Sequence, residues 1–149
     1  MSLAITLHLL AVIIWVGGMF FAYMALRPAA ASLEPSIRLR LWSYTFKRFF
    51  PWVWVSIITL LVTGIGIIQQ YGGMSEVGPH ILIMLLLGVI MMLLFLHVFF
   101  SPHKKLAHAV ESQDWGTGAK ALNQIRLLIA INLTLGLVTT VVGSAGQFY

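Results

Sequence analysis

The chain has 149 residues, of which 60% are hydrophobic and only 9% are charged. Soluble globular domains carry about 25% charged residues, so this composition excludes an ordinary water-soluble domain. The absence of cysteine excludes disulfides, thiolate metal sites and thiol redox chemistry.

Four stretches of the chain contain no charged residue, and each is long enough to cross a membrane. They comprise residues 1–26, 49–75, 77–103 and 127–149. A helix needs about 20 apolar residues to span a bilayer, so the pattern predicts four membrane-spanning helices. The expected fold class is all-α. We expect a single domain, residues 1–149, that forms an integral membrane antiparallel four-helix bundle in a lipid bilayer.

The first predicted helix runs from Leu3 to Leu26. We expect it to end near Arg27-Pro28, because proline disfavours a helical conformation at the residue before it. Its apolar run is too long for a cleaved signal peptide, and no basic segment precedes it. The following stretch, residues 36–50, mixes apolar with basic side chains. It predicts either an amphipathic interfacial helix or an extension of the second span.

The second predicted span covers residues 51–71, and a glycine-rich turn leads to the third, residues 79–101. The third span opens with proline, which suits the first turn of a helix because its missing N–H would have no partner there. The polar segment 102–123 is expected to be partly helical. The fourth span covers residues 124–146, and the short connections favour antiparallel neighbours.

All nine Lys and Arg residues lie in two connections, one before the second span and one before the fourth. The connection around Glu76 and both termini carry none. The positive-inside rule therefore predicts cytoplasmic basic connections and periplasmic termini, in a multi-pass protein of the bacterial inner membrane. This distribution accounts for the net charge of +5 without nucleic-acid binding. In the second basic connection, His103 and His108 are expected to lie on a solvated loop.

Three histidines, His8, His80 and His97, lie within the charge-free stretches, where an imidazole is costly and indicates a functional site. At 1.5 Å per helical residue, His8 and His80 are expected within about 3 Å of one depth. His97 is expected roughly 25 Å from His80 on the same helix, near the cytoplasmic side. Two imidazoles at matched depth on different helices form the arrangement that bis-histidine haem ligation requires.

The predicted haem ring lies between helices, with His8 as the first ligand, His80 as the second and His97 next. Trp15 and Gly18 on the His8 helix would line its apolar slot. Other roles stay open for the histidines. His8 also suits a structural hydrogen bond, His80 an interfacial position, and His97 a proton relay.

These features predict a membrane protein that binds haem b and acts in electron transfer or a membrane-coupled redox reaction. It would then be a haem-dependent oxidoreductase with unassigned catalytic residues, and a quinone or a periplasmic redox protein would be its electron partner. The alternative is a copper-handling transport or resistance protein. Seven methionines suit Cu(I), although no two have the i, i+4 spacing that stacks thioethers. A structural subunit without cofactor is a third hypothesis, and small-residue faces leave a homo-oligomer open.

The first helix carries a family resemblance. It reads LHLLAVIIWVGGMFF over residues 7–21 and closes with Leu26-Arg27-Pro28. This pattern resembles the opening helix of the CopD-like membrane protein family, which is associated with copper resistance and uptake. The resemblance implies a membrane protein with a role in copper handling.

The early histidine with its following Trp and Gly is also similar to the HemJ-type protoporphyrinogen oxidases. So is the third helix, which opens with His80 and closes with His97. This side of the resemblance implies haem b, bound by His8 and by His80 or His97. Leu82 and Met24 stand where that type has a lysine and an arginine. These departures favour a CopD-like haem protein with another substrate over protoporphyrinogen oxidation.

Overall fold

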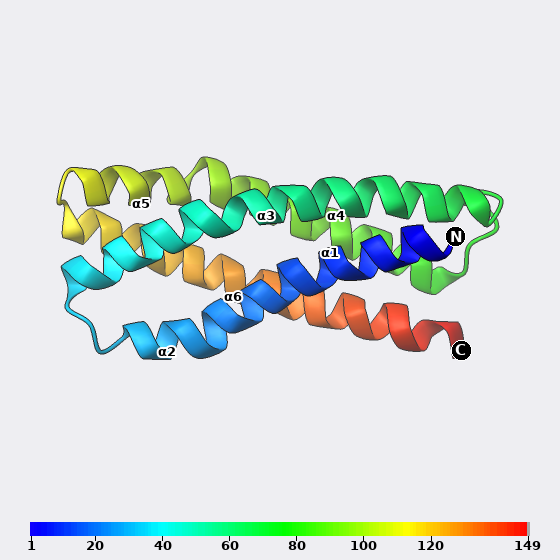
Figure 1. Ribbon diagram of the computed structural model, residues 1–149, viewed down its shortest axis with the longest axis horizontal. Coiled ribbons are helices and arrows are strands. Elements are labelled where there is room, and N and C mark those ends of the chain that lie inside the picture. The colour runs from blue at the N-terminus through cyan, green and yellow to red at the C-terminus, as the bar shows by residue number, and fades with distance from the viewer. Residues whose placement is uncertain (149) are drawn as a thin grey trace.

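Four long helical rods run alternately up and down in the computed structural model, which describes residues 1–148 (Figure 1). In chain order the elements are α1 (Ser2–Phe21), the π-helical turn η1 (Ala22–Leu26), α2 (Arg27–Ala30), α3 (Pro35–Gln70), α4 (Pro79–Phe100), α5 (Pro102–Glu111), α6 (Trp115–Ala145) and the 3-10 turn η2 (Gly146–Phe148). The predicted all-α four-helix bundle is confirmed. Four segments are long and apolar enough to cross a membrane: Ser2–Ala30, Pro35–Gln70, Pro79–Glu111 and Trp115–Phe148.

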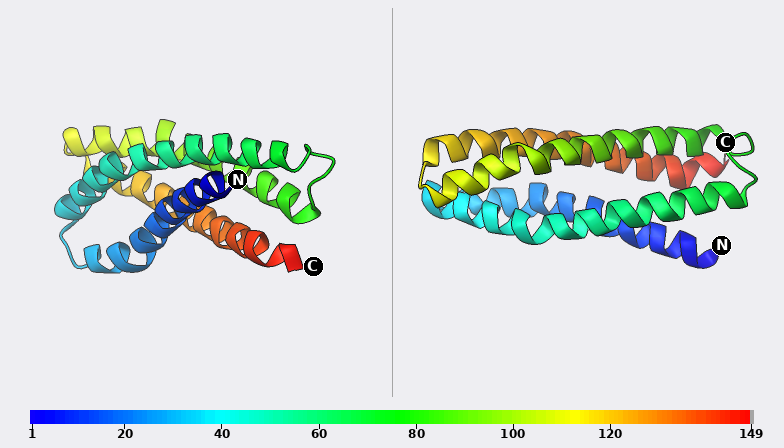
Figure 2. Two further views of the ribbon diagram at one scale, coloured as in Figure 1. Left: turned by 45° about the vertical axis from the view of Figure 1, so that its right-hand side comes forward. Right: turned by 90° about the horizontal axis from the view of Figure 1, so that it is seen from above.

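The bundle has two ends and two layers. The N-terminus, the turn between α3 and α4, and η2 lie at one end, here called the terminal end; the α2–α3 and α5–α6 connections lie at the other, the connection end (Figure 1). Seen from above, α1 and α3 form one layer, and α4, α5 and α6 form the other (Figure 2). The tightest helix pairs follow these layers, with α1 packed on α3 and with α4 and α5 packed on α6.

Two connections are more helical than the polarity of the sequence indicated. Residues 36–50 extend the second span, because α3 continues unbroken for 36 residues. At 1.5 Å per residue α3 is about 54 Å long, so its basic first third reaches beyond a hydrocarbon core of about 30 Å. The segment 102–123 forms α5 and the first turns of α6, which are separated only by residues 112–114.

The predicted end of the first helix at Arg27-Pro28 is wrong, since helical structure continues to Ala30. A proline inside an α-helix clashes with the carbonyl group four residues earlier. Here the wider π turn η1 precedes Pro28, and the Arg27 N–H bonds to the Ala22 carbonyl five residues back. The wider turn lets the chain accommodate Pro28 and keep its direction.

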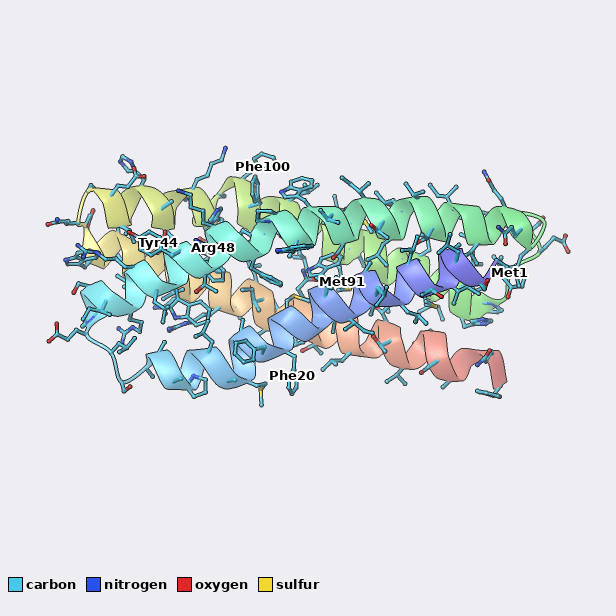
Figure 3. All side chains as sticks on the ribbon, viewed as in Figure 1. Met1, Phe20, Tyr44, Arg48, Met91 and Phe100 are labelled. Atoms are coloured by element: carbon cyan, nitrogen blue, oxygen red, sulfur yellow. The ribbon has the colours of Figure 1, made fainter. Side chains whose placement is uncertain are left out.

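Large apolar side chains cover the outside of the bundle, as expected for helices in contact with lipid. Figure 3 shows Phe20 and Phe100 projecting away from the ribbons, whereas Met91 lies between the helices. Glycines bring neighbouring helices together. A Cβ at Gly136, for example, would lie 2.9 Å from Val16 and 3.1 Å from Met91.

An aromatic cluster fills the bundle between its middle and the connection end. Its members are Trp42, Phe46, Phe50, Phe95, Phe99 and His103. The expected solvated-loop position is therefore wrong for His103, whose ring centroid lies 4.7 Å from that of Phe50. Pro102 starts α5 directly after α4, and this break turns His103 into the cluster. His108 is exposed, as expected, but it lies on α5 rather than on a loop.

The start of α6 depends on one exposed carboxylate. Asp114 accepts hydrogen bonds from the Thr117 hydroxyl at 2.7 Å and from the Thr117 backbone N–H at 3.2 Å. These bonds hold the pKa of Asp114 below its ordinary value. Because the ionised form is favoured in the folded chain, the cap stabilises α6 above the ordinary aspartate pKa. That contribution is lost as the pH falls through the lowered pKa.

We therefore expect the Thr117 amide to titrate with an acidic midpoint and the first turn of α6 to fray below it. NMR spectra of the detergent-solubilised protein, recorded from neutral into acidic pH, would show this in the Thr117 amide shift. The Asp114→Ala variant should lack the titration and be frayed throughout. An identical titration in that variant would rule out Asp114 as the cap.

Candidate functional site

His8 lies on α1 in the terminal half of the bundle, and its half-buried ring is fixed against α3. Its Nδ1 lies 2.8 Å from the Thr63 hydroxyl oxygen, and that hydroxyl donates its own hydrogen to the Thr59 carbonyl at 2.6 Å. Since the Thr63 hydrogen is already used, His8 Nδ1 donates the bond between the two side chains. The ring stands beside Gly64, where an added Cβ would be 3.6 Å from Cε1. This arrangement leaves Nε2 as the nitrogen with a free lone pair.

Replacing Thr63 with valine tests this hydrogen bond, because it keeps the branched shape and removes the hydroxyl. We expect a loss of about 0.6–1 kcal/mol in stability, the usual worth of such a bond between membrane helices. Nitrogen-15 NMR of the His8 imidazole should show a protonated Nδ1 in the wild type and a mixture of tautomers in Thr63→Val. An unchanged tautomer in the variant would show that Thr63 does not orient the ring.

His80 and Met84 form a second feature at the terminal end. They are four residues apart on α4, so their side chains lie on one face of that helix, one turn apart. That face packs on the end of α6. A Cβ at Gly143 would lie 2.9 Å from the Met84 sulfur, and a Cβ at Gly146 would collide with the Cβ of His80. The two glycines therefore bring the end of α6 directly against an imidazole and a thioether.

The chemistry of this pair is that of a soft-metal ligand set. Thioether sulfur favours Cu(I), and imidazole nitrogen binds copper in either oxidation state. Methionine pairs alone do not reveal this combination. The feature of the sequence that could have revealed it is a histidine and a methionine at i, i+4 spacing. Within residues 1–148, no three His, Asp or Glu side chains gather closely enough to hold a metal ion.

Trp15 and Gly18, expected to line a haem slot, lie in the packed middle of the bundle. The Trp15 ring is buried and stands edge-on to Phe95, with centroids 6.3 Å apart. Gly18 lies directly against the ring of Phe49, which an added Cβ would overlap. Aromatic side chains therefore occupy the space beside both residues, and their role towards haem stays a prediction.

The middle of the bundle also holds a buried amide that was not singled out from the sequence. The Asn132 side chain donates to the Met91 carbonyl at 3.2 Å, while its Oδ1 has no hydrogen-bond partner among residues 1–148. Asn132 lines a cavity of about 20 Å³ together with Trp15 and Phe95, which is the space that one water molecule needs. In the sequence, Asn132 could have been recognised as an amide side chain inside the charge-free residues 127–149.

The histidines occupy three different surroundings. His8 contacts α3, His80 contacts the end of α6, and His97 is exposed on the outer face of α4. The packing of the helices therefore does not by itself join two of these histidines as a pair. The assignment of His8, His80 and His97 as haem ligands stays a prediction.

A comparison with protein families gives a match over most of the chain. Residues 43–145 match a protein-family model described as "Copper resistance protein D". The matched range includes His80, Met84 and His97, and it begins after His8, Trp15 and Gly18. No curated protein and no solved structure matches the chain. The CopD-like resemblance is confirmed, whereas the similarity to HemJ-type enzymes stays a prediction.

Proposed function

Since the chain belongs to the copper resistance protein D family, we propose that it handles copper, with the metal bound as cargo at the terminal end. The observation that carries the proposal is that His80 and Met84, one turn apart on α4, both pack against the end of the fourth span at Gly146 and Gly143. Both residues lie within the part of the chain that matches the family model. The family match covers most of α3 and all of α4, α5 and α6, so the choice of α4 rests on the geometry.

The residues suit the reduced ion. Imidazole nitrogen and thioether sulfur are neutral ligands, so they bind Cu(I) without adding buried negative charge. Because His must be deprotonated at the ligating nitrogen, the affinity should fall in acid. The half-buried positions of His80 and Met84 allow access from the end of the bundle.

The orientation in the membrane follows from charge. The connection end carries every Lys and Arg, and the terminal end carries none. We propose that the terminal end faces the periplasm of a bacterial inner membrane, which would present the His80–Met84 pair to copper outside the cytoplasm. Cysteine labelling by a membrane-impermeant reagent tests this, with Ser75→Cys expected to react in intact spheroplasts and Ser112→Cys only after lysis.

Copper handling in cells provides the functional test. Cells that express the wild-type chain should differ in copper accumulation and copper sensitivity from cells with an empty vector. The His80→Ala, Met84→Leu double variant should behave like the vector at equal membrane expression. If the double variant matched the wild type, the terminal-end site would not carry the function.

Haem b with an electron-transfer role is the second candidate, and one observation favours it. Metal-bound histidines characteristically donate their other N–H to a fixed acceptor, as His8 does to Thr63. His8 Nε2 would then hold the haem iron, and the haem would supply the redox chemistry. This candidate predicts a Soret band in the purified protein that disappears in His8→Ala and persists in Met84→Leu.

A further inference from the structure

Three glycines surround the proposed copper pair, and each lies close to one member of it. Gly78 precedes α4 and Gly146 begins η2, and both lie against His80, whereas Gly143 on α6 lies against Met84. An alanine at any of the three positions would place its Cβ in space that the imidazole or the thioether now occupies. The positions of both proposed ligands therefore depend on residues without a side chain.

The two glycines beside His80 are not required by the conformation of the backbone. Gly78 has φ −68° and ψ 160°, and Gly146 has φ −62° and ψ −20°, which are conformations that any residue adopts. Glycine at the end of a helix ordinarily provides a left-handed cap with positive φ, and Gly146 does not. At the start of a helix, serine, aspartate or asparagine would cap the free N–H groups, which Gly78 cannot do. The small size of glycine is therefore what the structure uses at both positions.

The two glycines lie against different atoms of His80. A Cβ at Gly78 would lie 2.8 Å from Cε1 and 2.9 Å from Nδ1 of the imidazole. A Cβ at Gly146 would collide with the Cβ of His80 and would lie 2.9 Å from Cγ and 3.4 Å from Cδ2. The ring atom that belongs to neither set is Nε2. The edge of the ring that carries Nδ1 is thus packed against the start of α4, and Nε2 is the nitrogen that is left for a ligand.

We propose that Gly78 and Gly146 are positioning residues for the copper site, which hold the imidazole of His80 so that its Nε2 binds the metal. This inference rests on the proposed function, because it concerns the same pair of ligands. The two nitrogens of a histidine are distinct, and the surroundings of one decide whether the other binds a metal. A ring that is already held in its binding orientation also loses less conformational entropy when the metal binds.

The two glycines should differ in what their replacement does to the structure. In Gly78→Ala the added Cβ meets the far end of the His80 side chain, so the ring can rotate away while the helices stay in place. In Gly146→Ala it meets the Cβ of His80, which is fixed to the backbone of α4. The end of α6 must then move away from α4. Both variants should misplace Nε2, and only Gly146→Ala should also loosen the helix packing.

Nitrogen-15 NMR of the whole protein in neutral detergent tests the inference, first without metal and then with added Cu(I), which is diamagnetic. The His80 signals are identified by their loss in His80→Ala. In the wild type we expect Cu(I) to shift the Nε2 signal far more than the Nδ1 signal. In Gly78→Ala the metal-free ring signals should change. Its Cu(I) affinity, measured by competition with a coloured chelator, should fall about tenfold, as is usual when the groups that orient a metal-bound histidine are altered.

Gly88→Ala is the matched control, because Gly88 lies on the same helix and an added Cβ there would meet nothing within 4 Å. Its spectrum and affinity should equal those of the wild type. A Cu(I)-induced shift mainly at Nδ1 would overturn the inference, and so would Gly78→Ala and Gly146→Ala variants that both behave like Gly88→Ala. Either result leaves the copper site itself in place. If Cu(I) shifted neither nitrogen of His80 in the wild type, the proposed function would fail, and this inference with it.

Discussion

Replacing Met84 with leucine should lower the Cu(I) affinity of the protein by at least about tenfold, because a metal–sulfur bond worth 1.4 kcal/mol or more is lost. Leucine is close to methionine in volume and is tolerated in apolar packing, so the fold should survive. The affinity would be measured under reducing, anaerobic conditions by competition with a coloured Cu(I) chelator. His80→Ala should show a similar loss, and the double variant should show no binding above the chelator background.

A matched methionine controls for the loss of a thioether as such. Met24 lies in the π turn η1, is 56% exposed and is far along the bundle from the terminal end. Met24→Leu should therefore bind Cu(I) like the wild type. If Met84→Leu and Met24→Leu kept equal wild-type affinity, Met84 would not be a copper ligand.

Replacing Phe50 with alanine should have the largest effect on stability. Phe50 is 3% exposed and contacts rings on α3, α4 and α5: Phe46 at 5.1 Å, Phe95 at 5.3 Å and His103 at 4.7 Å between centroids. Truncation of a buried phenylalanine costs about 3–5 kcal/mol, since it removes contacts and leaves a cavity. The cavity would also adjoin the space beside Asn132, which Phe50 helps to line.

Reversible unfolding in mixed micelles, with denaturing detergent as the variable, would measure this loss. Phe100→Ala provides the control, because Phe100 is 56% exposed on α4 and points away from the bundle (Figure 3). The control should unfold at nearly the same detergent fraction as the wild type. Equal stability of the two variants would show that the aromatic cluster does not hold the helices together.

The spans could be predicted from sequence because the bilayer imposes a length and excludes charge. Helix ends were harder to predict, since they depend on local geometry rather than on polarity. Residues 36–50 are polar enough for a surface segment, yet they form the first part of α3. The π turn η1 lets the first helix continue beyond Pro28. Asp114 marks the start of α6 through a capping interaction that hydropathy does not detect.

The candidate site depends on how the helices are rotated about their axes, which residue spacing along one helix does not determine. His8 stands out in the sequence, but its hydrogen bond to Thr63 requires α1 and α3 to face each other at that level. His80 and Met84 share a face of α4 by spacing alone, and this relation was predictable. Their contact with Gly143 and Gly146 depends on the packing of α4 on α6.

Arg27 and Arg126 show a further limit of sequence reasoning. Charge patterning places both at the edges of charge-free stretches. That Arg126 Nε and the Trp42 indole N–H are both buried without an acceptor among residues 1–148 depends on how the helices pack in space.

We propose copper as the metal bound by this protein and the terminal end as the place where it binds. The most direct test is elemental analysis, together with an absorption spectrum, of protein purified in neutral detergent from copper-replete cells. We predict copper in near-stoichiometric amount, no Soret band, and loss of the copper in the His80→Ala, Met84→Leu variant. Protein without copper but with a Soret band that shifts on reduction would contradict the claim and establish the haem protein instead.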